Sequence, residues 1–315
     1  MATLTNTPIV LATTLAAFTT RVPALNMLSL DATADEMVLD QQAIAHIRSL
    51  PTAGTYDSST GYFNGANDQA GLLTDVPVTM NTHAHVTLSL NYLATLGDQK
   101  IDMALEDAAY VLGKQIVDSV LAKAAAAANV TYNEIETVAN TDLDTLRKIR
   151  TQMNTNKADP LNRFGLVSSA VAAKLDTDPM IVSKDYHGQQ SGGEGLLRFQ
   201  NVGGFREILE YPDLPTTATL QGIFFDPRLM VVKTALPKTT VELAASMGFA
   251  QTEVLDRQTD PNSGITLMMI KHTKPGTLDK FISFVMLYGS AAGAQGGSAG
   301  TLTDKAGVRL ITTAP

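Results

Sequence analysis

Two neighbouring segments of this sequence are both too long for a compact domain. From Val78 to Leu90 the even-numbered residues are apolar or small and the odd-numbered residues are polar. This alternation predicts a half-buried strand, because successive strand side chains point to opposite faces. At about 3.3 Å per residue, the strand would extend roughly 43 Å.

The second long segment begins at Asp98, a candidate helix cap, and closes in alanines at about Ala128. Apolar residues recur in it every three or four positions, which predicts a helix of roughly 45 Å with one buried face. The stripe consists of Ile101, Leu105, Ala108, Leu112, Ile116 and Val120. Together the two elements indicate a protein built to reach its neighbours.

The composition excludes several classes of protein. With 44% hydrophobic residues among 315, the chain can bury a substantial core. It has no cysteine, so disulfides and thiolate metal sites are excluded. A net charge of −8 argues against a dedicated nucleic-acid-binding protein, although an acidic protein can still enclose DNA. No segment approaches about eighteen uninterrupted apolar residues, so we expect no membrane span.

The first half of the chain contains a long stretch without lysine or arginine, between Arg48 and Lys100. Residues 1–41 suggest an arm, and residues 42–50 fit either a helix or a strand. The segment from Pro51 to Asp75 is rich in turn-forming residues and predicts a long hairpin tip. Its aspartates Asp57, Asp68 and Asp75 predict an acidic surface that meets a basic one.

The second half predicts shorter elements. A capped helix begins at Thr141 or Asp142, with Leu143, Leu146 and Met153 on one side. Residues 188–204 form a glycine-rich stretch that we interpret as a mobile loop, and residues 290–300 suggest a linker. We further expect a helix at Ser169–Leu175 and strands at Phe164–Val167, Phe205–Tyr211, Gly222–Phe225, Leu229–Lys233, Ile265–His272, Phe281–Leu287 and Val308–Thr312.

Motifs for catalysis or nucleotide binding are missing from the sequence. There is no G-x-S-x-G, no G-x-x-x-x-G-K-[ST] and no H-E-x-x-H. His83 and His85 would share one strand face and could hold a metal or titrate together. The favoured interpretation is that they fill polar positions of the alternating strand, because no third ligand is implied nearby. Asp226 and Arg228 flank Pro227 in a predicted turn. We therefore expect no enzyme activity, cofactor or metal.

A basic group lies on the helix predicted after Thr141. It consists of Arg147, Lys148 and Arg150, with Lys157 beyond the helix. These side chains could face a polyanion or accept the acidic loop of a neighbour. A solvated helix face explains them equally well.

The order of these segments resembles the major capsid proteins of tailed double-stranded DNA bacteriophages, which share the Hong Kong 97-like fold. The strongest local match is V-G-G-F-R-E-I-L-E-Y-P-D-L-P from Val202. Upstream, T-L-R-K-I-R-T-Q-M-N and D-P-L-N-R-F-G-L-V-S-S-A-V-A-A-K-L are similar to the family's helix, basic turn, strand and second helix. Downstream, Q-G-I-F-F-D-P-R-L-M-V-V-K and F-I-S-F-V-M-L-Y-G resemble its later strands.

The resemblance implies an α+β capsid fold with five parts. These are an N-terminal arm (1–41), an extended β-hairpin loop (42–92), a peripheral domain with the long spine helix (93–134), an axial domain (135–270) and a return to the peripheral domain with a C-terminal strand (271–315). The resemblance also implies self-assembly into hexamers and pentamers of an icosahedral head that encloses DNA. The location would be the virion, with assembly in the host cytoplasm.

Partners implied by the resemblance are other copies of the chain, a portal protein, a separate scaffolding protein and a decoration protein, with packaged DNA contacted non-specifically and no membrane. Candidate contact residues between subunits are Asp57, Asp68, Asp75, His83, His85, Arg147, Lys148 and Arg150. In some members of the family, a lysine of the extended loop forms an isopeptide bond that joins the subunits of the shell covalently. This loop has no lysine, so we expect a non-covalent shell.

Two rival interpretations stay open at this stage. An encapsulin-type shell shares the fold but encloses a cargo enzyme instead of a genome. A β-rich tail protein or adhesin fits the threonine-rich, cysteine-free composition, but the long predicted helix opposes it.

Overall fold

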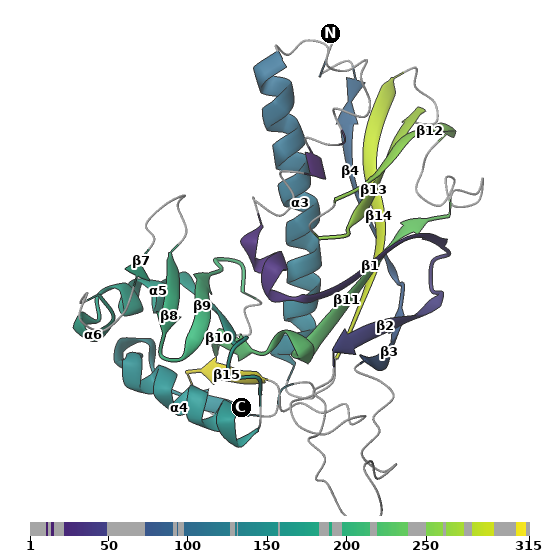
Figure 1. Ribbon diagram of the computed structural model, residues 1–315. Helices are drawn as coiled ribbons and strands as arrows, with labels where there is room; N and C mark the ends of the chain where they lie inside the picture. Colours follow the sequence, from purple (N-terminus) through teal and green to yellow (C-terminus); the bar gives the residue numbers. More distant parts are fainter. Residues whose placement is uncertain are drawn as a thin grey trace, which may run out of the picture. The chain divides into compact units, whose positions relative to one another are not determined.

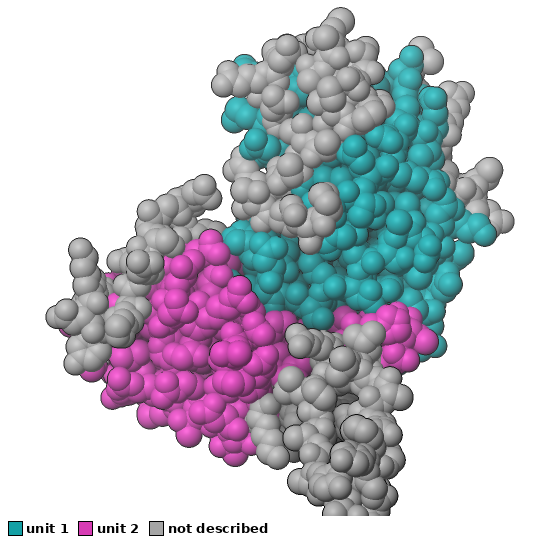
Figure 2. Space-filling view, in the orientation of Figure 1, with its two compact units in different colours: residues 1–43, 77–120, 232–291 teal, residues 44–76, 121–231, 292–315 magenta. Residues whose placement is uncertain are grey.

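The computed structural model describes the chain in several stretches, which are residues 11, 14–15, 22–48, 73–90, 93, 98–126, 130, 132–156, 158–182, 189–190, 197–214, 219–238, 250–260, 263–273, 279–292 and 307–312. The chain divides into two compact units (Figure 2). Unit 1 comprises residues 1–43, 77–120 and 232–291, and unit 2 comprises residues 44–76, 121–231 and 292–315. Each unit therefore combines segments that are far apart in sequence.

A six-stranded sheet lies mainly in unit 1 (Figure 1). Its order is β1 (Ser29–Met37), β11 (Met230–Pro237), β14 (Lys280–Ala292), β13 (Thr266–Thr273) and β12 (Ala250–Thr259), and β4 (Thr82–Ser89) also pairs with β14. The β4–β14 pairing is antiparallel and runs from Thr82 opposite Tyr288 to Ser89 opposite Phe281. The long strand β14 thus organises the sheet.

The helix α3 (Asp98–Ala125) has 28 residues and runs alongside β4 and β14 (Figure 1). All six residues of its predicted stripe are buried. The hydroxyl of Tyr288 on β14 donates to the Gln115 carbonyl oxygen at 3.3 Å, which places the strand against the helix. The predicted helix is confirmed, and it ends at Ala125, slightly before the expected boundary.

The arm before β1 also packs on α3. Its 3₁₀ turn η1 (Pro23–Met27) has buried apolar residues, among them Leu25. The absence of a side chain at Gly113 permits this approach, because a Cβ there would lie 2.8 Å from Val22 Cγ2. Residues 22–28 are therefore docked on the helix of their own chain.

The prediction of one strand from Val78 to Leu90 is wrong. The structure has β3 (Leu73–Thr79), which pairs with β2 (Gln42–Arg48), followed by β4 in the other sheet. The two strands meet at Met80, whose N–H donates to Gln41 O at 3.0 Å and whose carbonyl accepts from Asp40 N at 2.8 Å. The alternation continues through this change of partner because Val76, Val78, Met80 and Ala84 are all buried. Periodicity identified the buried face but not the break between the strands.

Unit 2 contains a seven-stranded mixed sheet. Its order is β5 (Asn133–Ile135), β15 (Gly307–Ile311), β10 (Leu220–Phe225), β6 (Phe164–Val167), β9 (Phe205–Glu210), β8 (Arg198–Val202) and β7 (Gln189–Gln190). The pairs β5–β15 and β6–β9 are parallel, and β10 is antiparallel to both of its neighbours. The α+β class predicted from the sequence is confirmed.

Helices pack on this sheet through apolar faces. In α4 (Leu143–Thr155), the Asp142 side chain accepts from Thr145 N at 2.9 Å and forms a capping box. The helix α5 (Ser169–Asp176) begins after the cap residue Ser168, and the short α6 (Pro179–Val182) follows. The 3₁₀ turns are η2 (Val138–Asn140) and η4 (Pro227–Leu229). Leu146, Ile149, Met153, Val171, Leu175, Phe205 and Phe224 belong to the common core.

Several boundaries differ from the predictions. β1 and β12 were not predicted, and residues 42–48 form a strand. The expected glycine-rich loop contains β8 because Phe199 and Val202 enter the core, and β14 extends to Ala292 into the expected linker. The expected hairpin tip at residues 51–72 lies outside the described residues. The division into five parts remains a prediction.

A substitution at Gly289 tests how closely β14 approaches β3. A Cβ at Gly289 would overlap the carbonyl oxygen of Thr79, and a backbone atom cannot rotate away. We expect Gly289→Ala to lower the free energy of unfolding by about 1–3 kcal/mol, as overpacking usually does. Urea unfolding measures the loss.

The matched control is Gly264→Ala, whose Cβ would meet only Ala32 Cβ at the ordinary distance of 3.4 Å, although its φ of +72° adds some strain. A Gly289→Ala variant no less stable than this control would contradict the close approach.

Candidate functional site

The outer face of α3 carries an exposed apolar stripe. Met103, Tyr110 and Val111 are 58%, 42% and 49% exposed, and residues seven or eight apart lie on the same side of a helix. Lys114 forms an ion pair of 2.9 Å with Asp118 further along the helix. We call Met103, Tyr110 and Val111 the α3 stripe. Large exposed apolar residues on one side of a helix make this face a candidate for contact with a partner.

The sequence prediction considered only the buried face of this helix and therefore did not identify the α3 stripe. Its three large apolar residues at positions expected to be polar could have indicated it. Among the described residues, no helix has the length and hydropathy that a membrane span needs.

Asp75 is the one predicted acidic contact residue whose position is described. It is exposed on β3, and its Oδ1 lies 2.9 Å from Nδ1 of His46 on the paired strand β2. Asp57 and Asp68 lie outside the described residues. The described carboxylate is therefore engaged by a histidine of its own chain and stays at the surface.

The histidines His83 and His85 lie on the polar face of β4, as the alternation predicts. They stand opposite Leu287 and Val285 of β14. A third histidine shares this region, because His272 Nε2 lies 2.7 Å from Ser283 Oγ, which lies 2.7 Å from Thr87 Oγ1 on β4. The proximity of His272 to β4 could not be predicted from the sequence, because it depends on the order of strands in the sheet. No group of three potential metal ligands forms within the described part of the chain.

Burial controls the titration of two of these histidines. Burial and the neighbouring charge of His85 lower the pKa of His83, and both ring nitrogens of His83 are buried without a hydrogen-bond partner. The pKa of His272 is also lowered by burial and by His85, although a backbone hydrogen bond with Thr273 opposes the shift. Both imidazoles therefore favour the neutral form in the folded chain.

The basic residues of α4 have three different environments. Arg147 donates to Asp144 at 2.7 Å, and Lys148 lies 3.7 Å from Glu134 and 4.0 Å from Glu136. Arg150 instead packs over Gly204, where a Cβ would overlap its side chain. The structure therefore satisfies Arg147 and Lys148 within unit 2, and it brings neither of them to a predicted acidic partner.

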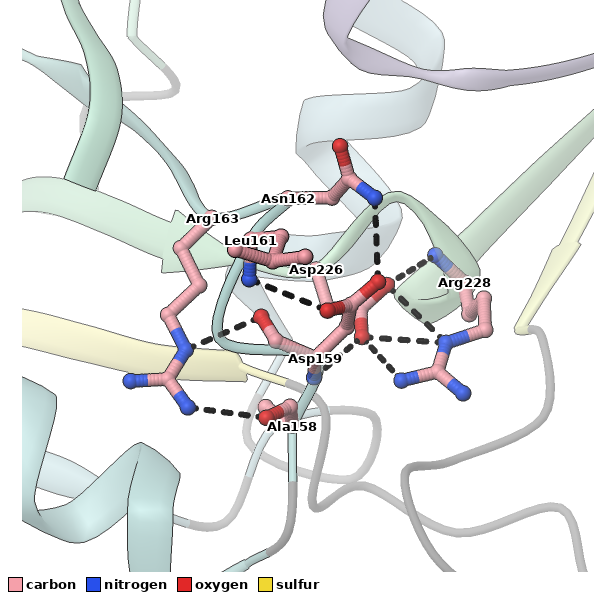
Figure 3. Close-up of polar contacts among 7 residues, drawn as sticks. All are labelled: Ala158, Asp159, Leu161, Asn162, Arg163, Asp226 and Arg228. Atoms are coloured by element: carbon pink, nitrogen blue, oxygen red, sulfur yellow. Dashed lines mark hydrogen bonds and ion pairs between the residues drawn. The ribbon is translucent and has the colours of Figure 1, made fainter. Parts of the chain in front are cut away.

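A buried polar network around Asp226 was also missed (Figure 3). The Asp226 carboxylate is 1% exposed, accepts from Arg228 and accepts from Asp159 N at 2.9 Å. Burial tends to lower the pKa of Arg228. The hydrogen bond to Asp226 and the negative charges of Asp226 and Asp159 outweigh burial and raise the pKa of Arg228. The predicted turn is confirmed, but the sequence gives no signal that its aspartate is buried.

The Asp159 carboxylate forms the second half of this network. Burial tends to raise its pKa. The Leu161 backbone N–H, the Asn162 amide and the charges of Arg228 and Arg163 outweigh burial and hold the pKa of Asp159 below its usual value. The network therefore favours the ionised form of the Asp159 carboxylate at the turn between α4 and β6.

No protein-family model matches the chain, and no curated protein matches it. Among solved structures, the chain is similar to the capsid structure of the Cyanophage P-SCSP1u, with 13% identity, coverage of 90% of this chain and 86% of that chain, and a TM-score of 0.46. It is also similar to a virus-like particle from Pyrococcus furiosus, with 9% identity, coverage of 96% and 97%, and a TM-score of 0.49. At TM-scores below 0.5, these similarities do not by themselves transfer a function.

The histidine positions predict loss of stability in acid. The folded-state pKa values of His83 and His272 lie below the unfolded value of about 6.5, so the unfolded chain binds protons more readily as the pH falls. The stabilising contribution is therefore present above about pH 6.5 and is lost as the pH falls through the folded-state values. We expect a lower thermal midpoint at pH 5 than at pH 7.5.

The double variant His83→Gln/His272→Gln should show a smaller difference between the two midpoints. The variant His46→Gln, at an exposed position, serves as the control. An unchanged pH difference in the double variant would show that these two histidines do not govern the acid sensitivity.

Proposed function

We propose that this chain is a structural major capsid protein with the Hong Kong 97-like fold, which assembles into the hexamers and pentamers of an icosahedral phage head around double-stranded DNA. The observation that carries the proposal is α3. It buries one face along its 28 residues and presents the α3 stripe on the other face. A helix of this kind suits a subunit that is completed by its neighbours.

The sequence order described above supports the same proposal. Two of the similar solved structures, a cyanophage capsid and a virus-like particle, agree with it, although their similarity is too low to carry it. A typical interface between two subunits buries about 1,600 Å² of surface in total. Several such interfaces per subunit would stabilise a closed shell that a single interface could not stabilise. In this proposal residues 51–72 lie over an adjacent subunit, whereas β3 and β4 belong to sheets of their own chain. The helix α4 lines contacts about the capsomer axis.

The net charge of the chain is more compatible with a protein shell that encloses DNA than with a protein that binds DNA tightly. A net charge of −8 favours weak, non-specific contact with packaged DNA, which must slide during packaging. The proposal includes a portal, a separate scaffolding protein and a decoration protein as partners. It places the mature protein in the virion and its assembly in the host cytoplasm. The role is structural, without enzyme chemistry.

An encapsulin-type shell around a cargo enzyme is the second candidate, because such a shell would have the same fold. Nucleic acid of genome length inside purified particles separates a phage head from such a shell. A tail protein or adhesin is less compatible with the long helix α3.

The α3 stripe gives a direct test of assembly. We expect Tyr110→Asp to reduce the yield of closed shells at least about tenfold, because an unpaired carboxylate at a subunit contact costs a few kcal/mol. Electron microscopy and sedimentation count the shells, and circular dichroism shows whether the subunit is folded.

Tyr110→Phe is the matched control, since it keeps the aromatic ring and should assemble normally. Shells formed by the folded Tyr110→Asp variant at the normal yield would exclude the α3 stripe from assembly.

The missing lysine predicts how the shell is held together. No lysine occurs between Arg48 and Lys100, so the extended loop has no amine for an isopeptide bond. We expect particles boiled in SDS to run as a single monomer band. A ladder of covalent oligomers would contradict a non-covalent shell.

A further inference from the structure

The loop Ala158–Arg163 between α4 and β6 is held by two charged side chains that are almost fully buried. Arg163, 2% exposed, donates to the carbonyl oxygens of Ala158 at 2.8 Å and Asp159 at 3.1 Å (Figure 3). Asp226 accepts from Asp159 N, as described above. Buried charges are costly unless they are paired, so a loop that uses two of them is strongly fixed in one conformation.

The tip of this loop presents a leucine to solvent. The Asp159 carboxylate accepts from Leu161 N at 3.0 Å and from Asn162 Nδ2 at 2.9 Å, which orients the tip. The Leu161 side chain is 79% exposed, more than any other exposed large apolar side chain among the described residues. A single exposed leucine is common on protein surfaces. This one differs because its backbone is already ordered, so binding would cost little further conformational entropy.

Arginines without an acidic partner lie around the same loop. Arg206 donates to Asn162 Oδ1 at 3.2 Å, and its guanidinium lies 5.8 Å from the centre of the Phe164 ring. The Arg150 side chain packs over Gly204, two residues before Arg206 in the sequence. Within the described residues, neither Arg150 nor Arg206 forms an ion pair. We call Leu161, Arg206 and Arg150 the Leu161 patch.

A partner for the Leu161 patch needs carboxylates together with apolar side chains. The chain itself contains such a segment at residues 49–72, which has two aspartates and no lysine, arginine or histidine. Its aromatic residues are Tyr56, Tyr62 and Phe63, and its acidic residues are Asp57 and Asp68. Half of this segment, extended at about 3.3 Å per residue, spans roughly 40 Å, which is enough to reach another molecule.

We propose that the Leu161 patch of one copy binds the acidic, aromatic segment 49–72 of a second copy. This inference rests on the proposed function, and it identifies the surface that would bind the extended loop of a neighbouring subunit. Arginine is well suited to this role because its planar guanidinium can bind a carboxylate through two hydrogen bonds and can also stack on an aromatic ring. The apolar tip would be covered by the aromatic side chains of the segment.

The absence of native cysteine permits a clean test by disulfide formation. The single-cysteine variants Leu161→Cys and Asp68→Cys are mixed, allowed to assemble and oxidised, and covalent dimers are separated on non-reducing SDS gels. A disulfide needs the two Cα atoms within about 7 Å. We expect at least fivefold more heterodimer than from the control pair Met180→Cys and Asp68→Cys, in which Met180 is an exposed residue of α6 in the same unit.

Electron microscopy of the unmodified chain separates this inference from the proposed function. Shells without heterodimer above the control would overturn the inference and leave the capsid proposal intact. If the heterodimer forms but no closed shells appear, the result would support the contact and count against the capsid proposal. A chain that carries both cysteines and closes only on itself would also overturn the inference.

A charge exchange provides an independent measurement. We expect Arg206→Glu to reduce assembly at least about tenfold, and Arg206→Glu combined with Asp57→Arg and Asp68→Arg to recover most of it. Circular dichroism confirms that each variant is folded. Normal assembly of the Arg206→Glu variant, or no recovery in the combined variant, would contradict the proposed pairing.

Discussion

Burial of one face of α3 is the constraint on which unit 1 depends. Leu105, Leu112 and Ile116 are at most 1% exposed, and burying each such side chain contributes about 1.5–3 kcal/mol. With 28 residues, the helix is more than twice the usual length of about 11–12. The arm packs at Gly113 and β14 contacts the helix through Tyr288, so both segments depend on its position.

The sequence predicted α3 and most strands of the core because their signals are local. A helical stripe, a cap residue or an alternating run depends only on nearby residues, and Phe164–Val167 was predicted with its observed bounds. Strand partners depend on the whole chain. The run through Met80 therefore looked continuous although its two halves join different sheets. The strand β12 was missed because Glu253, Asp256 and Arg257 give it no alternating pattern.

The candidate site was less predictable than the fold. Predictions based on charge identified Arg150 and Asp75 as surface residues, but could not show which charges are satisfied within the chain. Arg147, Lys148 and Asp75 all have partners of their own, whereas Arg150 does not have an acidic one among the described residues. The buried Asp226 and the exposed Leu161 lie in similar polar turns in the sequence, so their opposite environments come only from the three-dimensional structure.

The position of β15 affects the order in which the protein can be completed during translation. It lies inside the sheet of unit 2, between β5 and β10, and Arg309 on this strand donates to the carbonyl oxygen of Ala125 at the end of α3. β15 follows β10 by roughly 80 residues, so at about 5–20 residues per second the sheet stays open for several seconds. The sheet of unit 2 therefore cannot be completed until residues 307–311 have left the ribosome, and until then the strand that joins β5 to β10 is missing.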